Sequence, residues 1–98
     1  MYVVMNRFTI HPGKNGEFEG RWRDRQSHLK EVPGFLRFRL LKLDDTTYSS
    51  YAEWESAAAF GDWTRSEAFH QAHARGAPVG VMAGPPRLEC WEVILDEA

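Results

Sequence analysis

The sequence has little of what several large classes of protein require. Its single cysteine, Cys90, excludes an intrachain disulfide. No apolar run approaches the roughly 20 residues that cross a bilayer, and the first residues lack the pattern of a secretion signal, so we expect a cytoplasmic protein away from membranes. Fourteen acidic and twelve basic residues are spread along the chain. Because no basic stripe results, nucleic acid is not an expected partner.

Motifs for several common chemistries are also missing. The sequence contains no glycine-rich nucleotide loop and no G-x-S-x-G motif, which argues against nucleotide and hydrolase chemistry. His70 and His73 are three residues apart, but the other candidate ligands follow no zinc spacing. Cys90 stands between Glu89 and Trp91 in an expected strand, so we predict a buried, inert thiol.

Aromatic residues, by contrast, are abundant. The 98 residues include four tryptophans, six phenylalanines and three tyrosines. This number suits a dense core, a large subunit interface or a pocket for a flat aromatic ligand. The length fits one domain spanning residues 1–98.

Hydrophobic periodicity and turn residues predict the order β-α-β-β-α-β, which is the ferredoxin-like arrangement of the α+β class. We expect an antiparallel sheet with both helices on one face. The segment 76–86 is rich in glycine and proline and is expected to be a loop that could move. The expected elements are strands over residues 2–10, 35–43, 47–55 and 87–95, a helix over 14–30, and two helical pieces between 56 and 75.

Apolar residues fall on both faces of this expected sheet. One phase contains Leu36, Leu40, Trp54 and Cys90, and the helices cover only that side. We therefore expect two copies of the chain to pack sheet against sheet as a homodimer. The opposite phase holds Leu41, Leu43, Tyr51, Trp91, Val93 and Leu95.

Asn6 is the residue that does not fit the first strand. Alternation places it on the same face as Val4 and Phe8. Burying an amide without a partner costs roughly 1 to 3 kcal/mol. Asn6 is therefore either a satisfied core amide or a hydrogen-bond donor in a pocket.

Three further residues have both an ordinary and a functional interpretation. Trp22 on the first helix and Trp63 at the break between the two later helical pieces are each most simply core aromatics. His73 is most simply an ordinary helix histidine. It lies four residues after Phe69, however, so the face that buries Phe69 should carry the imidazole inward. A buried imidazole needs a partner or a role.

The whole chain resembles the antibiotic biosynthesis monooxygenase superfamily, whose small ferredoxin-like subunits dimerise into an α+β barrel. The segments PGFLRFRLL (33–41) and AEWESAAAF (52–60) carry this resemblance. Asn6 in the first strand, Trp63 at the helix break and His73 ten residues later resemble, more specifically, the IsdG-type haem-degrading monooxygenases.

This resemblance implies a site. His73 would ligate haem iron, with its second ring nitrogen donating to a carbonyl group. Asn6 would donate to oxygen on the other side of the haem, and Trp63 would press on the porphyrin and distort it. Trp22 stands where the family often has phenylalanine and would form a larger pocket wall. The catalytic residues would then be Asn6, Trp63 and His73, with Trp22 joining them in binding haem.

The resemblance also implies a reaction. Haem would be both cofactor and substrate, opened with oxygen to a bilin-type product and free iron, using electrons from a reductase or a small external reductant. Two alternatives stay open. One is a cofactor-independent monooxygenase of the same superfamily acting on a quinol or polycyclic phenol, and the other is a non-catalytic haem-binding protein.

Overall fold

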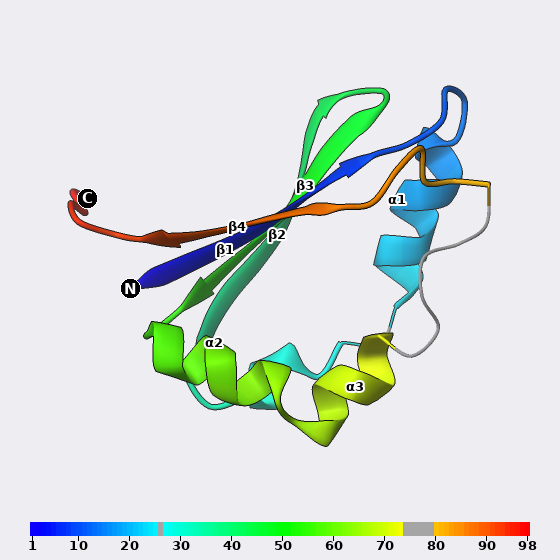
Figure 1. The fold of residues 1–98 in the computed structure, drawn as a ribbon. Helices are drawn as coiled ribbons and strands as arrows, with labels where there is room; N and C mark the ends of the chain where they lie inside the picture. The colour runs from blue at the N-terminus through cyan, green and yellow to red at the C-terminus, as the bar shows by residue number, and fades with distance from the viewer. Residues whose placement is uncertain (26, 74–79) are drawn as a thin grey trace.

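The computed structural model describes residues 1–25, 27–73 and 80–98. Within them, a four-stranded antiparallel sheet has the order β2-β3-β1-β4, and the helices lie on one side of it (Figure 1). This architecture confirms the predicted ferredoxin-like α+β fold. The elements are β1 (Tyr2–Thr9), α1 (Asn15–Asp24), the 3-10 helix η1 (Leu29–Glu31), β2 (Phe35–Asp44), β3 (Thr47–Trp54), α2 (Ala57–Thr64), α3 (Glu67–His73) and β4 (Arg87–Glu92).

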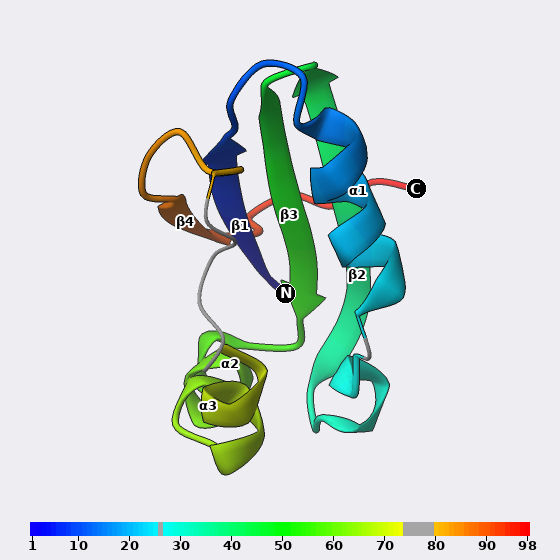
Figure 2. The ribbon, with the colours of Figure 1, turned by 90° about the vertical axis from the view of Figure 1, so that its right-hand side faces the viewer.

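The helices divide into two groups over the sheet. Figure 2 shows α1 running alongside β2 and β3, whereas α2 and α3 lie at one end of the strands. Strand register fixes which side chains share the face toward the helices: Tyr2 pairs with Trp54, Val4 with Ala52 and Asn6 with Ser50. The helix-side face of β1 and β3 therefore presents Tyr2, Val4, Asn6, Phe8, Tyr48, Ser50, Ala52 and Trp54.

The best-buried cluster lies where α1 meets the sheet. It comprises Ile10, Phe18, Tyr48 and Val81, each at most 4% exposed. Val81 belongs to the segment that we expected to move, and its carbonyl accepts a hydrogen bond from the His11 amide at 2.9 Å. Around residue 81 the segment is therefore buried and hydrogen-bonded, and the Ala83 amide donates to the Thr9 carbonyl of β1 at 2.8 Å, so movement of the segment stays a prediction. Residues 76–79 lie outside the described part of the chain.

Helix α1 is shorter than the predicted span of 14–30. The backbone leaves helical geometry at Arg25, where ψ is 142°. The Arg25 guanidinium lies over the rings of Trp22 and Phe38, 4.7 and 4.5 Å from their centroids. This cation–π stacking is consistent with the extended backbone, and the Ser27 hydroxyl then accepts a hydrogen bond from the Leu29 amide as η1 begins.

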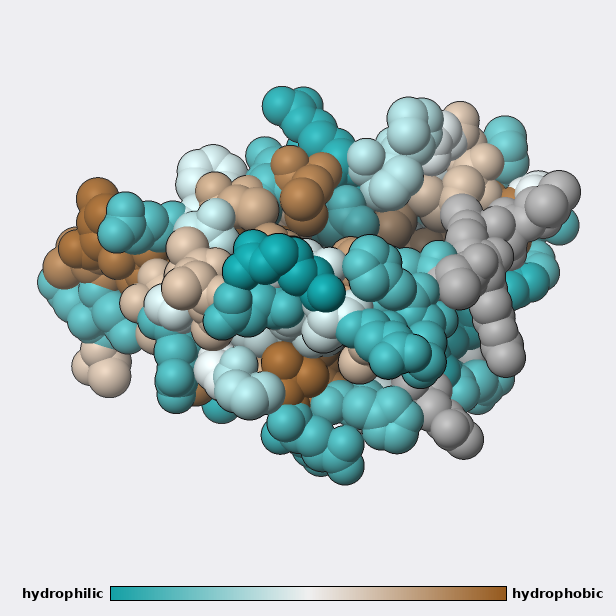
Figure 3. Space-filling model, turned by 60° about the horizontal axis from the view of Figure 1, so that its bottom comes forward, coloured by the Kyte–Doolittle hydropathy of each residue, from teal (hydrophilic) through white to brown (hydrophobic). Residues whose placement is uncertain are grey.

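Strand β4 is also shorter than the predicted 87–95. Its last contact with β1 is a hydrogen bond from the Val93 amide to the Met1 carbonyl at 3.0 Å, so the next residues have no neighbouring backbone in β1. Ile94 and Leu95 are 93% and 73% exposed. In Figure 1 the C-terminal segment projects from the left end of the molecule. Figure 3 shows an apolar patch at the same end.

The sheet face away from the helices is mixed in character. Leu41 and Trp91 expose 38% and 54% of their surface on it. An ion pair joins Arg37 to Glu53 at 3.8 Å on the same face. Leu41 and Trp91, two of the six predicted apolar residues, are therefore exposed on this face in a single chain, whereas Tyr51 and Val93 are half-buried. No helix in the described ranges is long and apolar enough to span a membrane.

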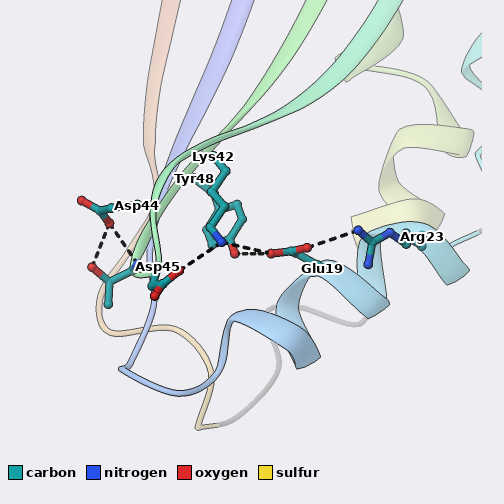
Figure 4. Close-up of polar contacts among 7 residues, drawn as sticks. Glu19, Arg23, Lys42, Asp44, Asp45 and Tyr48 are labelled. Atoms are coloured by element: carbon teal, nitrogen blue, oxygen red, sulfur yellow. Dashed lines mark hydrogen bonds and ion pairs between the residues drawn. The ribbon is translucent and has the colours of Figure 1, made fainter.

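A polar network links α1 to the β2–β3 hairpin (Figure 4). The Tyr48 hydroxyl donates a 2.5 Å hydrogen bond to Glu19, and Arg23 and Lys42 lie 3.2 and 3.9 Å from the same carboxylate. The hydrogen bond from Tyr48 lowers the pKa of Glu19. Burial raises the pKa of Tyr48.

Tyr48→Phe should lower the melting temperature by a few degrees at neutral pH, because it removes a hydrogen bond to a charged group. The folded-state pKa of Glu19 is lowered, so its stabilising effect is present above the unfolded pKa and is lost as the pH falls through the folded pKa. The difference between the two proteins should therefore shrink in acid. Thermal melts across this pH range test the prediction, and a difference that is constant with pH contradicts it.

Candidate functional site

Two serine caps set the positions of α2 and α3. The Ser56 hydroxyl accepts a hydrogen bond from the Ala59 amide at the start of α2, and Ser66 accepts one from the Phe69 amide at the start of α3, both at 3.1 Å. The Ser66 hydroxyl also donates to the Trp63 carbonyl at 2.6 Å. Ser66 thus fixes the turn that places Trp63 next to α3.

Ser66→Ala should lower the free energy of unfolding by about 1 kcal/mol through loss of the cap. Ser56→Ala is the matched control, since it removes a cap of equal length at the other end of α2 from Trp63, and its hydroxyl bonds Ala59 rather than Trp63. Chemical denaturation should show similar losses for the two variants. Only Ser66→Ala should also change the near-UV circular dichroism of the tryptophans, because it alone removes a hydrogen bond to the Trp63 carbonyl, and equal spectra for the two variants would argue against this positioning.

Trp63, Phe69 and His73 form an aromatic cluster on α2 and α3. The Phe69 ring stacks on His73 with centroids 4.1 Å apart and meets Trp63 edge-on at 4.8 Å. The centroids of Trp63 and His73 are 6.0 Å apart. Trp54, fully buried on β3, lies 5.4 Å from Trp63 and connects the cluster to the sheet.

One ring nitrogen of the His73 imidazole is hydrogen-bonded within the chain. Its Nδ1 lies 2.8 Å from the Phe69 carbonyl oxygen, which can only accept, so Nδ1 carries the proton and Nε2 keeps its lone pair in the neutral ring. The expected contact with a carbonyl group is therefore present. The expectation of an inward-facing, buried His73 is wrong for the single chain: its side chain is exposed, because α3 lies beyond the end of the strands (Figure 1).

Asn6 lies in the middle of β1, between Ser50 on β3 and Leu88 on β4. Its Oδ1 atom is buried and has no hydrogen-bond partner among the described residues. Turning the amide by half a rotation exchanges the oxygen and the NH₂ group, so the same position can offer an acceptor or a donor. Of the two readings left open by the sequence, the satisfied core amide is not observed.

Short side chains occupy the sheet between Asn6 and Trp54. Trp54 is level with Tyr2, four residues from Asn6 along β1, which corresponds to about 13 Å of strand. Val4, Ala52 and Cys90 lie side by side between these two levels. A flat ligand lying over this region would meet no bulky side chain from these three positions.

Trp22 lies apart from the His73 cluster. Its ring stacks on Phe38 with centroids 5.6 Å apart and meets Phe8 at 5.7 Å, beneath α1. It also lines a groove of about 420 Å³ between α1 and β2, together with Arg25. The structure thus brings Trp63 and His73 together, places Asn6 on the sheet, and assigns Trp22 to the packing under α1.

Two residues near the site were not proposed as site residues from the sequence. Trp54 shares the helix-side face with Asn6, and strand alternation was the signal that could have identified it. Cys90 lies on the same face opposite Val4, and the prediction that it is buried is wrong: Cys90 is exposed. The cause is its place on edge strand β4, which has a neighbour on one side only.

Together, the fold and these side chains define a ferredoxin-like α+β protein with an available imidazole beside a tryptophan and an unpartnered amide on its sheet. The model of the antibiotic biosynthesis monooxygenase family matches residues 1–75, and the chain belongs to this family.

Two relatives named for haem degradation match three quarters or more of the chain. A heme oxygenase (mycobilin-producing) of Mycobacterium tuberculosis is 34% identical over 96 residues, covering 96% of this chain and 90% of that protein. A heme-degrading monooxygenase of Shouchella clausii is 32% identical over 80 residues, covering 76% and 72%. The solved structure of the heme degrader MhuD from M. tuberculosis, with two hemes bound in its active site, superposes with a TM-score of 0.80 at 32% identity, covering 100% of both chains.

Proposed function

We propose that this protein is a haem-degrading monooxygenase that opens the porphyrin ring with oxygen and external electrons, giving a bilin-type product and free iron. The observation that carries the proposal is the His73 imidazole, whose Nδ1 is held by the Phe69 carbonyl beside Trp63. The two relatives named for haem degradation, and the large share of this chain that they match, support the same activity.

His73 is the residue that would hold the iron. Hydrogen bonding of Nδ1 to a carbonyl fixes the tautomer and the ring orientation, which is how ligand histidines are commonly supported. Phe69 stacks on the ring and limits its rotation further. Exposure of His73 leaves its Nε2 atom accessible to a large ligand.

The remaining residues fit haem in a consistent way. When bound, haem supplies the iron that activates oxygen and the ring that is opened. Asn6 would donate a hydrogen bond to the co-substrate through the NH₂ group of its amide, whose buried Oδ1 has no partner among the described residues. Trp63 would press on the macrocycle and distort it, and Trp22 would contribute a wall from the α1 side.

Ring opening consumes electrons, so an external donor is needed. We propose that a reductase or a small cytoplasmic reductant supplies them. The sequence offers no glycine-rich nucleotide loop through which this chain would bind a nicotinamide itself. The physiological donor would then be a separate protein or small molecule.

The test is a haemin titration of the purified haem-free protein, followed by ascorbate in air with catalase present. A saturable Soret band near one haem per chain that bleaches with release of chelatable iron is expected. Binding without bleaching, even with a competent reductase, would indicate a haem carrier or sensor. Absence of specific binding would redirect the search to quinols and polycyclic phenols.

We also propose that the protein is a homodimer formed by the sheet faces away from the helices. Leu41 and Trp91 expose apolar surface there, and two edge strands leave the sheet open at both sides. The ion pairs Arg37–Glu53 and Arg7–Glu89 neutralise some of the charges on the same face within one chain. Such a surface suits a second copy better than water.

Leu41→Asp should convert the dimer to a monomer, because a carboxylate would be buried in an apolar interface. Leu88→Asp is the matched control: Leu88 is 59% exposed but lies on the helix-side face, so the dimer should persist. Sedimentation velocity distinguishes the two outcomes. A monomeric parent, or dissociation by both substitutions alike, would contradict the proposed interface.

A further inference from the structure

A line of aromatic rings leads from the candidate site to Tyr2 at the start of β1. Trp63 beside His73 is 5.4 Å from Trp54, and Trp54 is 5.7 Å from Phe60. Phe60 is in turn 6.2 Å from Tyr2. Tyr2 is also the cross-strand neighbour of Trp54, so the two side chains leave the same face of the sheet at the same level.

We propose that Trp63, Trp54 and Tyr2 form an electron relay that carries oxidising equivalents out of the haem site to the surface. The proposal rests on the proposed function, since haem and oxygen are what would place an oxidant beside Trp63. The relay would serve protection: an oxidant that fails to react with its substrate would be reduced before it damages the site.

The path is set by which neighbours of Trp63 can be oxidised. Its ring contacts in the described part of the chain are Trp54, Phe60, Phe69 and His73. Phenylalanine and imidazole are much harder to oxidise than indole. The electron that reduces oxidised Trp63 would therefore come from Trp54. No ring contact among the described residues joins Trp63 to Trp22 in the cluster under α1.

The buried surroundings of Trp54 suit an intermediate in electron transfer. It is 0% exposed, and its Nε1 atom has no hydrogen-bond partner in the described residues. An oxidised indole normally becomes a long-lived neutral radical by losing its N–H proton. Without an acceptor, oxidised Trp54 keeps this proton, stays a strong oxidant, and takes an electron from Tyr2.

The solvent-accessible surroundings of Tyr2 suit the last residue of the relay. It lines a surface pocket of about 290 Å³ with Glu92, so a phenolic proton can leave to water there. The neighbouring Cys90 thiol also raises the pKa of the Tyr2 phenol. The phenol is thus neutral before oxidation, and its proton leaves together with the electron.

The electrons and protons balance as follows. In each passage Trp63 would give one electron to the peroxide-derived oxidant at the haem site, one electron then moves from Trp54 to oxidised Trp63, and one moves from Tyr2 to Trp54 while the phenolic proton passes to water. Ascorbate or a thiol then returns one electron and one proton to the tyrosyl radical. Two such passages supply the two electrons that, with two protons, break the O–O bond of one hydrogen peroxide and give two waters.

The experiment starts the relay at a known point without haem. His11, His28 and His70 are replaced by glutamine, and a ruthenium polypyridyl photo-oxidant is coordinated to His73 of the full chain. Flash-quench oxidation with transient absorption should show a tryptophan radical and then a tyrosine radical. Trp54→Phe should abolish the tyrosine signal, and Trp91→Phe, which changes an exposed tryptophan on the other sheet face, should leave it intact.

Tyr2→Phe provides the second test, because Tyr2 is only half-buried and its loss should not affect folding. Here the tryptophan radical should form and persist while the tyrosine signal is lost, although Tyr48 and Tyr51 are still present. A tyrosine signal that survives Trp54→Phe or Tyr2→Phe would overturn the relay. Failure of haemin to bind the unlabelled protein would instead reject the proposed function, which this photochemical result does not require.

Discussion

His73→Ala is expected to abolish haem-dependent turnover and to weaken haemin binding by at least about 100-fold, since changes to groups that merely support a ligand histidine already cost 10- to 100-fold. The imidazole is the only group in the Trp63–Phe69 cluster able to bind iron through nitrogen with its tautomer fixed. An optical titration with haemin and a turnover assay with ascorbate measure the two effects.

His70→Ala is the matched control. His70 lies on the same short helix and is exposed, and its one ring contact among the described residues is with the edge of Phe69 at 5.8 Å. Haemin affinity and turnover should stay at the level of the parent. Added imidazole should partly restore the Soret band of His73→Ala, because it replaces the lost ligand without refolding the chain. Equal defects in the two histidine variants would remove His73 from its proposed role.

Local sequence signals predicted the elements of this fold well where they agree with tertiary contacts. Ser56 begins α2 with the hydrogen bond that its side chain is suited to make. Strand alternation placed Asn6 on the face toward the helices, and the register with Ser50 bears this out. Such features depend on residues within a few positions of one another, which periodicity and turn chemistry describe.

Features that depend on distant residues were predicted less well. The end of α1 is accompanied by Arg25 stacking on Phe38, a residue of another element, so the helical pattern alone extended too far. Exposure of His73 and Cys90 depends on what covers the end of the sheet and its edge strand. The spacing from Phe69 to His73 correctly predicted ring contact but not burial. Contact and burial are separate properties when a helix lies beyond the sheet.

Asn6 shows why a residue can lower stability and still serve the site. Its Oδ1 atom is buried without a partner in the described residues. A buried unsatisfied polar group costs free energy, and a polar group of this kind is tolerated where a ligand completes its hydrogen bonding. The haem-free protein should therefore become more stable when the amide is removed, while the enzyme should become slower.

Asn6→Leu should raise the free energy of unfolding of the haem-free chain by about 1 kcal/mol, because a side chain of similar shape replaces an unsatisfied amide. Asn6→Leu and Asn6→Ala should both bind haemin yet turn over about 100-fold more slowly, the loss typical of removing one donor from a charge-stabilising site. Ser50→Ala, at the paired position on β3, should change neither. Denaturant unfolding and turnover are measured on the same preparations. A less stable Asn6→Leu variant would mean that the amide is hydrogen-bonded in the folded chain. Unchanged turnover in Asn6→Ala would remove the catalytic role of Asn6.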